Sequence, residues 1–244
     1  MNIFEKLLMV HRFWRYRYNS EEKFDVDFLL KQRLLGKIAV DIGANKGIYT
    51  YYMSKKVGMH GKVIAFEPQP ELGLFLSDLK QTFNLANVTI VNKALSDSSG
   101  TKILFREKPC SGGASFSKHD GCETIPVETI TLDKYVHENG ITDIRFIKCD
   151  VEGYEREVFL GGYETLKAHM PILLFECLHS HAQQGDVFSY LTQLNYNGFF
   201  FYQRNAIHFS QFAKYGYWKP ERSHRNYIFM QDEEFQKMQI TMRC

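Results

Sequence analysis

Residues 37–50 read Lys37-Ile38-Ala39-Val40-Asp41-Ile42-Gly43-Ala44-Asn45-Lys46-Gly47-Ile48-Tyr49-Thr50. Within them an apolar, β-branched run ends in a glycine-containing turn, and apolar and aromatic positions at helical spacing follow. This order predicts a strand, a loop and a helix, the minimal unit that brings backbone N–H groups to a ligand beside a helix N-terminus. At Gly43 and Gly47 the missing Cβ permits either a positive φ or close contact with that ligand.

The acid at the end of this strand distinguishes between cofactors. A dinucleotide-binding fold carries G-x-G-x-x-G after the strand, with its glycines around a pyrophosphate. Here the pattern is Asp41-x-Gly43-x-Asn45-x-Gly47, and a carboxylate at that point would repel a diphosphate at short range. It suits a ligand with an ammonium or a sulfonium group, and S-adenosylmethionine carries both.

A second acid supports this interpretation. Residues 61–68 predict the next strand, which ends at Glu67, 20 residues after Gly47. A carboxylate at the end of a second strand can accept hydrogen bonds from both ribose hydroxyls. The alternative is a simple strand-to-helix turn in which Asn45 caps the helix and no ligand binds.

Composition limits the class of protein. The 244 residues fit one α/β domain with additions, and 44% hydrophobic and 15% aromatic residues suffice for a sizeable core. A formal net charge of +2 implies no strong positive electrostatic field that would attract polyanions, so a nucleic-acid partner is not predicted. The five cysteines form no C-x-x-C pair, which favours a reducing, cytoplasmic setting over a disulfide framework or a zinc site. No apolar stretch approaches the length of a membrane span.

Residues 3–17 form a basic, aromatic segment with a helical pattern. One interpretation is a helix that docks on the domain or covers its ligand cleft. The other is peripheral attachment to an anionic membrane surface. We favour docking, because the polar positions do not segregate onto one face of the predicted helix.

From Lys37 onward, apolar strands alternate with helices. Strands are predicted at 37–42, 62–66 and 88–92, with helices near 46–57 and 70–83. This alternation indicates a parallel sheet with helices on both faces. Ligands of such sheets bind beyond the carboxyl ends of the strands. We therefore expect Asp41, Glu67 and Ala94 to line one crevice.

The second half continues the alternation. An edge strand is predicted at 101–106, a strand at 123–129 and a short helix at 132–138; between the two strands, the small-residue loop 109–117 is either a lid or a surface insertion. Residues 145–162 then predict a strand ending at Asp150, a turn through Gly153 and a helix closed by Gly161 and Gly162. A strand at 171–179, a helix near 184–195 and strands near 199–203 and 226–230 complete the sheet.

Five segments together resemble a known family. They read VDIGANKGIYT, VIAFEP, NKALSD, FIKCDVEGYEREVFLGG and ILLFECLH, and in order and spacing they resemble the FkbM-type methyltransferases. The resemblance covers roughly residues 37–230 and implies a Rossmann-like class I methyltransferase sheet, mostly parallel with an antiparallel C-terminal strand. It divides the chain into an N-terminal extension, 1–36, and a methyltransferase domain, 37–244. It implies S-adenosylmethionine-dependent O-methylation of a hydroxyl on a sugar or a polyketide-type product.

The resemblance also assigns donor-binding residues. A methionine pocket is implied around the first loop, a ribose contact at the second acid, and an adenine contact after the third strand. The residues are Asp41, Gly43, Ala44, Asn45, Gly47, Tyr49, Glu67, Pro68, Ala94 and Leu95. By the same resemblance, Asp150 would sit beside the reactive methyl group.

An alcohol is a poor nucleophile near neutral pH, so a base within hydrogen-bond reach would assist it. The candidates at strand ends are Asp150, His179, Glu152 and Glu176, with the first two preferred. Glu152 could instead cap the following helix, and His179 could be an ordinary loop histidine. The four could also collect magnesium or manganese. We do not favour a metal, because the spacing carries no dedicated ligand signature.

The acceptor is expected to be a saccharide or another hydroxylated small molecule. The aromatic and basic residues Tyr215, Tyr217, Trp218, Arg222, His224 and Arg225 fit either acceptor contacts or surface packing. Alternatives are a non-catalytic module that binds S-adenosylmethionine and a methyltransferase of a non-sugar natural product. Methylation of nucleic acid is disfavoured, since there is no N-P-P-Y-like motif and no strong basic patch. The sequence specifies neither the hydroxyl nor the oligomeric state.

Overall fold

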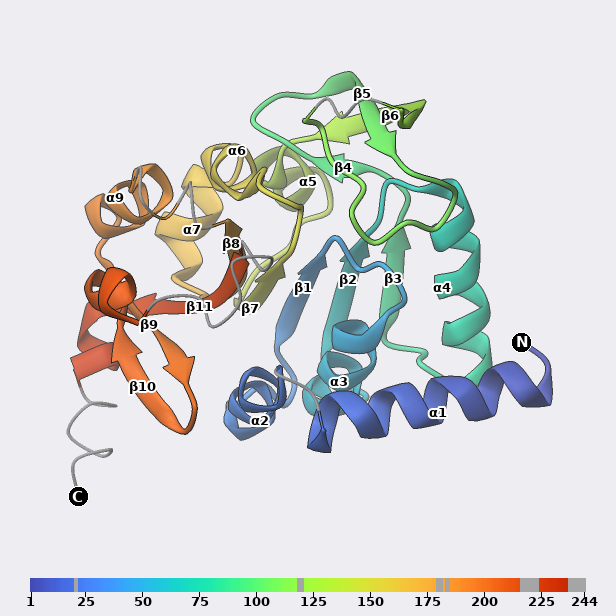
Figure 1. Ribbon diagram of the computed structural model, residues 1–244, viewed down its shortest axis with the longest axis horizontal. Coiled ribbons are helices and arrows are strands. Elements are labelled where there is room, and N and C mark those ends of the chain that lie inside the picture. Colours follow the sequence, from blue (N-terminus) through green and yellow to red (C-terminus); the bar gives the residue numbers. More distant parts are fainter. Residues whose placement is uncertain (20–21, 118–120, 179–181, 183–184, 216–223, 237–244) are drawn as a thin grey trace.

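The computed structural model describes residues 1–19, 22–117, 121–178, 182, 185–215 and 224–236, and its main sheet has eight strands (Figure 1). Their order across the sheet is β10-β9-β11-β8-β7-β1-β2-β3. In chain order they are β1 (Ile38–Ile42), β2 (Lys62–Phe66), β3 (Val88–Val91), β7 (Ile144–Cys149), β8 (Ile172–Leu178), β9 (Tyr196–Tyr202), β10 (Asn205–His208) and β11 (His224–Gln231).

The direction of the strands confirms the predicted fold class. Strands β3, β2, β1, β7 and β8 pair in parallel, whereas β11 pairs antiparallel with both β8 and β9. The hairpin strand β10 adds a further antiparallel pair at the edge. The sheet is thus mostly parallel, with an antiparallel C-terminal strand, as the sequence predicts.

Helices cover both faces of the sheet. They are α1 (Ile3–Tyr18), α2 (Lys23–Lys31), α3 (Ile48–Val57), α4 (Pro70–Thr82), α5 (Leu132–Glu138), α6 (Glu155–Leu160), α7 (Tyr163–His169) and α9 (Asp186–Gln193), with a 3₁₀ helix, η1 (Phe209–Lys214). Alternation along β1 divides the core: Ala39 joins the cluster on the α1–α4 side, and Val40 and Ile42 join the cluster on the other side. Burial on both faces explains why the strand reads as a continuous apolar run.

A second, three-stranded sheet lies beyond the carboxyl ends of β1–β3 (Figure 1). It consists of β4 (Ala94–Leu95), β5 (Gly100–Arg106) and β6 (Glu123–Ile130). The buried Arg106 ties it to the main domain, because its guanidinium pairs with Glu71 of α4 at 2.7 Å and with Glu123 at 3.2 Å. The predicted strand at 101–106 is therefore part of this small sheet. We call the small sheet the roof, because it covers the carboxyl ends of β1–β3.

The N-terminal segment packs against the main domain. Helix α1, predicted from the sequence, buries Met9 and Phe13, and the ring of Phe13 stacks on Tyr51 at 3.9 Å between centroids. Helix α2 was not predicted; its Asp25 accepts a hydrogen bond from Asn226 of β11 at 3.0 Å. No helix in the described ranges combines the length and apolarity needed to cross a bilayer.

Candidate functional site

The loop after β1 is a tight turn built on positive φ angles. Gly43, Asn45 and Gly47 have φ values of 74°, 48° and 73°. The backbone N–H groups of Gly43 and Ala44 both donate to the carbonyl of Phe66, each at 3.0 Å, which ties the loop to the end of β2. A Cβ on Gly47 would lie 2.7 Å from Leu79 of α4. Gly47 thus permits close packing of the loop on α4.

Gly43 also allows β1 to approach β7. The N–H of Asp150 donates to the carbonyl of Ile42 at 3.0 Å, so the ends of the two strands stay hydrogen-bonded. A Cβ built on Gly43 would overlap the carbonyl oxygen of Asp150. Only glycine fits at this point, and the contact brings the first loop against the strand that carries the predicted catalytic acid.

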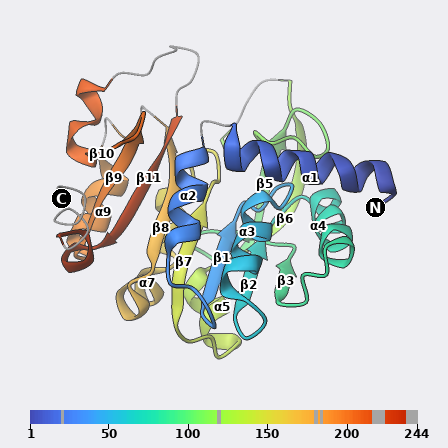
Figure 2. The same cartoon turned by 90° about the horizontal axis from the view of Figure 1, so that it is seen from below.

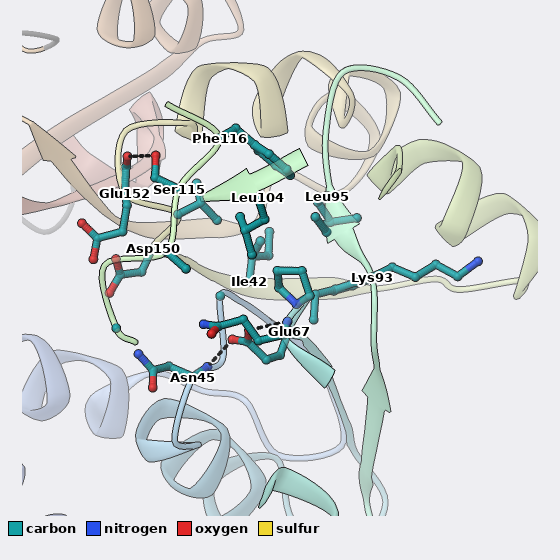
Figure 3. A pocket seen from close by; sticks show the side chains of 18 residues that line it. Ile42, Asn45, Glu67, Lys93, Leu95, Leu104, Ser115, Phe116, Asp150 and Glu152 are labelled. Carbon is teal, nitrogen blue, oxygen red and sulfur yellow. Dashed lines mark hydrogen bonds between the residues drawn. The ribbon is translucent and has the colours of Figure 1, made fainter. Parts of the chain in front are cut away.

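One cavity, which we call the Glu67 cavity, opens at the ends of β1 and β2 and has a volume of about 800 Å³ (Figure 3). Its lining includes six of the predicted donor-binding residues: Gly43, Asn45, Glu67, Pro68, Ala94 and Leu95. The buried carboxylate of Glu67 accepts hydrogen bonds from the N–H groups of Asn45 at 2.8 Å and Gln69 at 3.0 Å. Burial raises its pKa to about 7.

The loop at 109–117 forms one wall of the Glu67 cavity, so it is part of the site rather than a remote insertion. Gly112, Ala114, Ser115 and Phe116 line the cavity. The loop is fixed in place by the Gln69 side chain, which donates to the carbonyl of Ser111 at 2.9 Å. The Ser115 hydroxyl also donates to the carbonyl of Glu152, and Phe116 lies toward Leu95 in Figure 3.

A second cavity, the Tyr49 cavity, lies between α1 and the ends of β1 and β7, with a volume of about 1210 Å³. Its lining includes Asp41, Ala44 and Tyr49 from the predicted donor set, and also Lys148. Gly43, Asn45 and Asp150 line both cavities, so the two adjoin at the end of β1. The predicted single crevice is therefore a pair of cavities, with Glu67 and Ala94 in one and Asp41 in the other.

Two buried side chains shape the inner end of the Tyr49 cavity. The carboxylate of Asp41 accepts a hydrogen bond from the Thr50 hydroxyl at 2.5 Å, and burial raises its pKa to about 6. The Tyr49 hydroxyl donates to Glu22 at 2.8 Å. Gly47 lines neither of these cavities, so its contribution is to loop geometry.

The predicted catalytic acids Asp150, Glu152 and Glu176 converge: one carboxylate oxygen from each lies within 4.8 Å of the others. Burial, followed by the charge of Asp150, raises the pKa of Glu152 to about 7 and that of Glu176 to about 9. Carboxylates this close together oppose one another's ionisation, which adds to the effect of burial on Glu152 and Glu176.

Lys148 lines the Tyr49 cavity beside Asp150, and the sequence analysis did not select it. Its buried ammonium lies 3.4 Å from the Asp150 carboxylate and 3.4 Å from the side-chain oxygen of Asn226. Burial alone would lower the pKa of Lys148, but Asp150 and Glu176 together hold it above its usual value. A charged residue inside the apolar run of β7 was the available signal.

One alternative role is excluded, and one predicted residue lies outside the described residues. The turn after β7 is capped by Glu155, whose carboxylate accepts from the N–H groups of Val151 at 3.1 Å and Gly153 at 3.2 Å. Glu152 is thus not the capping residue, and its side chain projects beside Asp150 in Figure 3. His179 lies outside the described residues.

The C-terminal aromatic and basic residues that the structure describes pack together. Arg225 donates to the carbonyl of Tyr215 at 2.7 Å, and its guanidinium lies 4.2 Å from the ring centroid of Phe200. Neither Arg225 nor Tyr215 lines the Glu67 or the Tyr49 cavity, which supports the packing interpretation for these two. Tyr217, Trp218 and Arg222 fall outside the described residues, as does the side chain of His224.

The fit at Gly43 predicts a specific cost for a methyl group there. Gly43→Ala should lower the free energy of unfolding by about 1 to 3 kcal/mol more than Gly36→Ala, because the added carbon meets the Asp150 carbonyl. Gly36 is a matched control, with a φ of 75° and no atom within 4 Å of a built Cβ. Urea unfolding of both variants measures the difference. Equal costs would show that the two strands do not approach as closely as described.

Comparisons with known proteins show which family the chain resembles. The Methyltransferase FkbM domain pattern matches residues 41–198. Hexuronic acid methyltransferase AglP of Haloferax volcanii is 28% identical over 187 residues, which cover 75% of this chain and 73% of that protein. Ribosomal RNA large subunit methyltransferase E of Wigglesworthia glossinidia brevipalpis is 25% identical over 166 residues, covering 64% of this chain and 79% of that protein.

Solved structures show the same fold. The crystal structure of methyltransferase FkbM from Methylobacillus flagellatus KT superposes with a TM-score of 0.55 at 16% identity, and this chain spans 45% of its length while 82% of this chain is covered. SMU.1697c from Streptococcus mutans, solved in complex with SAH, gives a TM-score of 0.53 at 11% identity, with 87% of this chain and 98% of that chain covered. Since the domain match extends over more than half of the residues, the chain belongs to the FkbM methyltransferase family and is a methyltransferase of the class I fold.

Proposed function

We propose that this protein transfers a methyl group from S-adenosylmethionine to a hydroxyl of an acidic saccharide. The observation that carries the proposal is the pair of adjoining cavities, which meet at Asp150. The Glu67 cavity offers a buried acid and apolar side chains. The Tyr49 cavity has acidic residues at its inner end and basic residues of α1 along its outer wall. This arrangement fits a donor on one side, an acceptor on the other, and a base between them.

The Glu67 cavity fits the adenosine half of the donor. Glu67 can accept hydrogen bonds from ribose hydroxyls, and Leu95 and Phe116 provide an apolar surface for the adenine ring. Across the shared wall, Asp41 and Asp150 offer negative charge to the ammonium and sulfonium groups. When bound, S-adenosylmethionine supplies an electrophilic methyl group, so alignment and exclusion of water are the main requirements.

Asp150 is the best placed general base. It lines both cavities, and the buried Lys148 ammonium lies 3.4 Å from its carboxylate. A carboxylate at this position can accept the proton that the acceptor hydroxyl loses. The Lys148 ammonium donates to the Asp150 carboxylate and to the side-chain oxygen of Asn226, so polar groups surround the proposed base. The convergence of these groups argues against a non-catalytic binding module.

The Tyr49 cavity fits an acceptor that carries negative charge. Helix α1 lines it with His11, Arg12 and Arg15. Among the described residues, neither arginine makes an ion pair with a carboxylate. Arginine binds carboxylate and phosphate groups through paired N–H donors. The name of the AglP relative, a hexuronic acid methyltransferase, supports a uronic acid over a neutral sugar or a non-sugar natural product.

The donor assignment predicts the effect of Glu67→Gln. The amide keeps the size of the side chain but replaces one acceptor oxygen with a donor, which faces an N–H group or a ribose hydroxyl. Affinity for S-adenosylhomocysteine, measured by calorimetry, should fall at least about tenfold. Glu107→Gln, an exposed residue outside the cavity, should leave it unchanged. Undiminished affinity in Glu67→Gln would refute the assignment of this cavity to the donor.

The catalytic assignment predicts that two similar substitutions differ. Asp150→Asn should lower kcat by roughly a hundredfold or more, with S-adenosylhomocysteine affinity nearly unchanged. Glu176→Gln should have a much smaller effect near neutral pH, because the amide imitates the protonated acid. Single-turnover rates on the same acceptor provide the comparison.

The same carboxylates could instead bind a divalent cation through their oxygens, which remains the disfavoured alternative because the Lys148 ammonium already faces Asp150. Under our assignment, methyl transfer continues after exhaustive chelation. Loss of activity with EDTA and recovery with magnesium or manganese would reassign Asp150 and its neighbours to a metal site.

The acceptor assignment predicts selectivity for acidic sugars. In the presence of S-adenosylhomocysteine, D-glucuronate should bind more tightly than D-glucose, as measured by NMR titration. The double variant Arg12→Gln/Arg15→Gln should weaken glucuronate binding at least about tenfold, since hydrogen bonds to charged groups are the stronger ones. Lys31→Gln/Arg33→Gln removes the same two charges at exposed residues away from the cavity and controls for net charge. Equal binding of the two sugars would contradict an acidic acceptor.

A further inference from the structure

Helix α1 exposes an unusual amount of apolar surface. In the described part of the chain, seven of the twelve large apolar side chains classed as exposed belong to this one helix: Ile3, Phe4, Leu7, Leu8, Val10, Trp14 and Tyr18. Ile3 and Phe4 are each 73% exposed and Leu7 is 61% exposed. Clustering of this kind marks an interaction surface, whereas single exposed apolar residues do not.

The exposed residues form one stripe. Ile3, Leu7, Val10 and Trp14 recur at helical spacing, so they share one side of α1. The opposite side carries Met9 and Phe13, which are buried against the domain. Figures 1 and 2 both show α1 running along the outside of the domain. The helix therefore has two apolar faces, of which the protein itself covers one.

Basic residues flank the stripe. At 100° per residue, Lys6 lies at one border of the stripe and Arg15 at the other. Glu5 is the only acidic residue of α1, against four lysines and arginines. Trp14 and Tyr18 add the amphipathic rings that favour the boundary between lipid and water. A narrow apolar stripe with cations at its borders is the pattern of a helix that lies in the plane of an anionic membrane surface.

We propose that α1 binds the surface of an anionic lipid bilayer, with the stripe inserted among the headgroups and Lys6 at the phosphates, while Arg15 stays at the Tyr49 cavity. A second copy of this chain fits less well as the occupant, because two stripes face to face would bring their basic borders together. Since α1 also lines the Tyr49 cavity, this contact would hold that cavity beside the bilayer. The membrane contact itself does not rest on the proposed function; only the placement of an acceptor cavity beside the bilayer does.

Vesicle co-sedimentation of the full-length protein tests the proposal. The wild type should bind vesicles of phosphatidylcholine and phosphatidylglycerol, bind phosphatidylcholine alone more weakly, and lose affinity as salt increases. Leu7→Ser/Trp14→Ser should lower the partition coefficient at least about tenfold, and Lys6→Gln should lower it only on the anionic vesicles. Leu74→Ser removes an exposed leucine on α4 and should bind as the wild type does.

Two further measurements distinguish the outcomes. S-adenosylhomocysteine affinity should be the same in the double variant as in the wild type, which shows that the domain is folded. Light scattering after size exclusion reports whether the stripe joins two copies. The proposal is overturned if the wild type does not bind anionic vesicles, or if the double variant binds them as well as the wild type does. It is also overturned if the wild type is a dimer and the double variant is a monomer.

Discussion

The site depends on one contact, where the Cα of Gly43 lies against the carbonyl of Asp150 at the ends of β1 and β7. This approach places the loop that holds Asn45 beside the strand that ends at Asp150, the proposed catalytic acid. The same loop is tied to β2 through the carbonyl of Phe66 and the carboxylate of Glu67. Three strand ends are thus locked together by backbone groups and one buried carboxylate. Because the other lining side chains take no part in this framework, the cavities around it can vary in lining without losing their position.

Burial of charge is the second constraint. Asp25, Asp41, Glu67 and Glu155 are all buried, and burial raises the pKa of each to about 6 or 7. Such a concentration of acids is tolerable only if most are protonated, hydrogen-bonded or paired with a cation. Lys148 supplies the buried positive charge and directs it at Asp150. The arrangement places the Asp150 carboxylate, faced by the Lys148 ammonium, where the two cavities meet.

Local signals in the sequence predicted most of the main sheet and most of the strand-end residues that line the two cavities. Strand-end acids and glycines have fixed positions in such folds, so Asp41, Gly43 and Glu67 could be located from spacing alone. The three-stranded roof was missed because β4 has two residues and its pairing with β6 is distant in the sequence. Helix α2 was missed because Glu22 at its start makes no side-chain cap. The contact between Glu22 and Tyr49 joins segments 27 residues apart, which no local pattern specifies.

Helix α1 docks on the domain, as the favoured interpretation of residues 3–17 predicted. Its polar residues do not segregate onto one side, because α1 has two opposite apolar faces separated by basic borders. The inner face packs on the domain, and a cationic edge lines the Tyr49 cavity. This helix precedes residues 41–198, the part matched by the family pattern. The Glu67 cavity is thus built from the shared domain, whereas α1 adds residues to the Tyr49 cavity from outside it. Under the proposed function, a change in α1 can therefore alter the acceptor without disturbing Gly43 or Glu67.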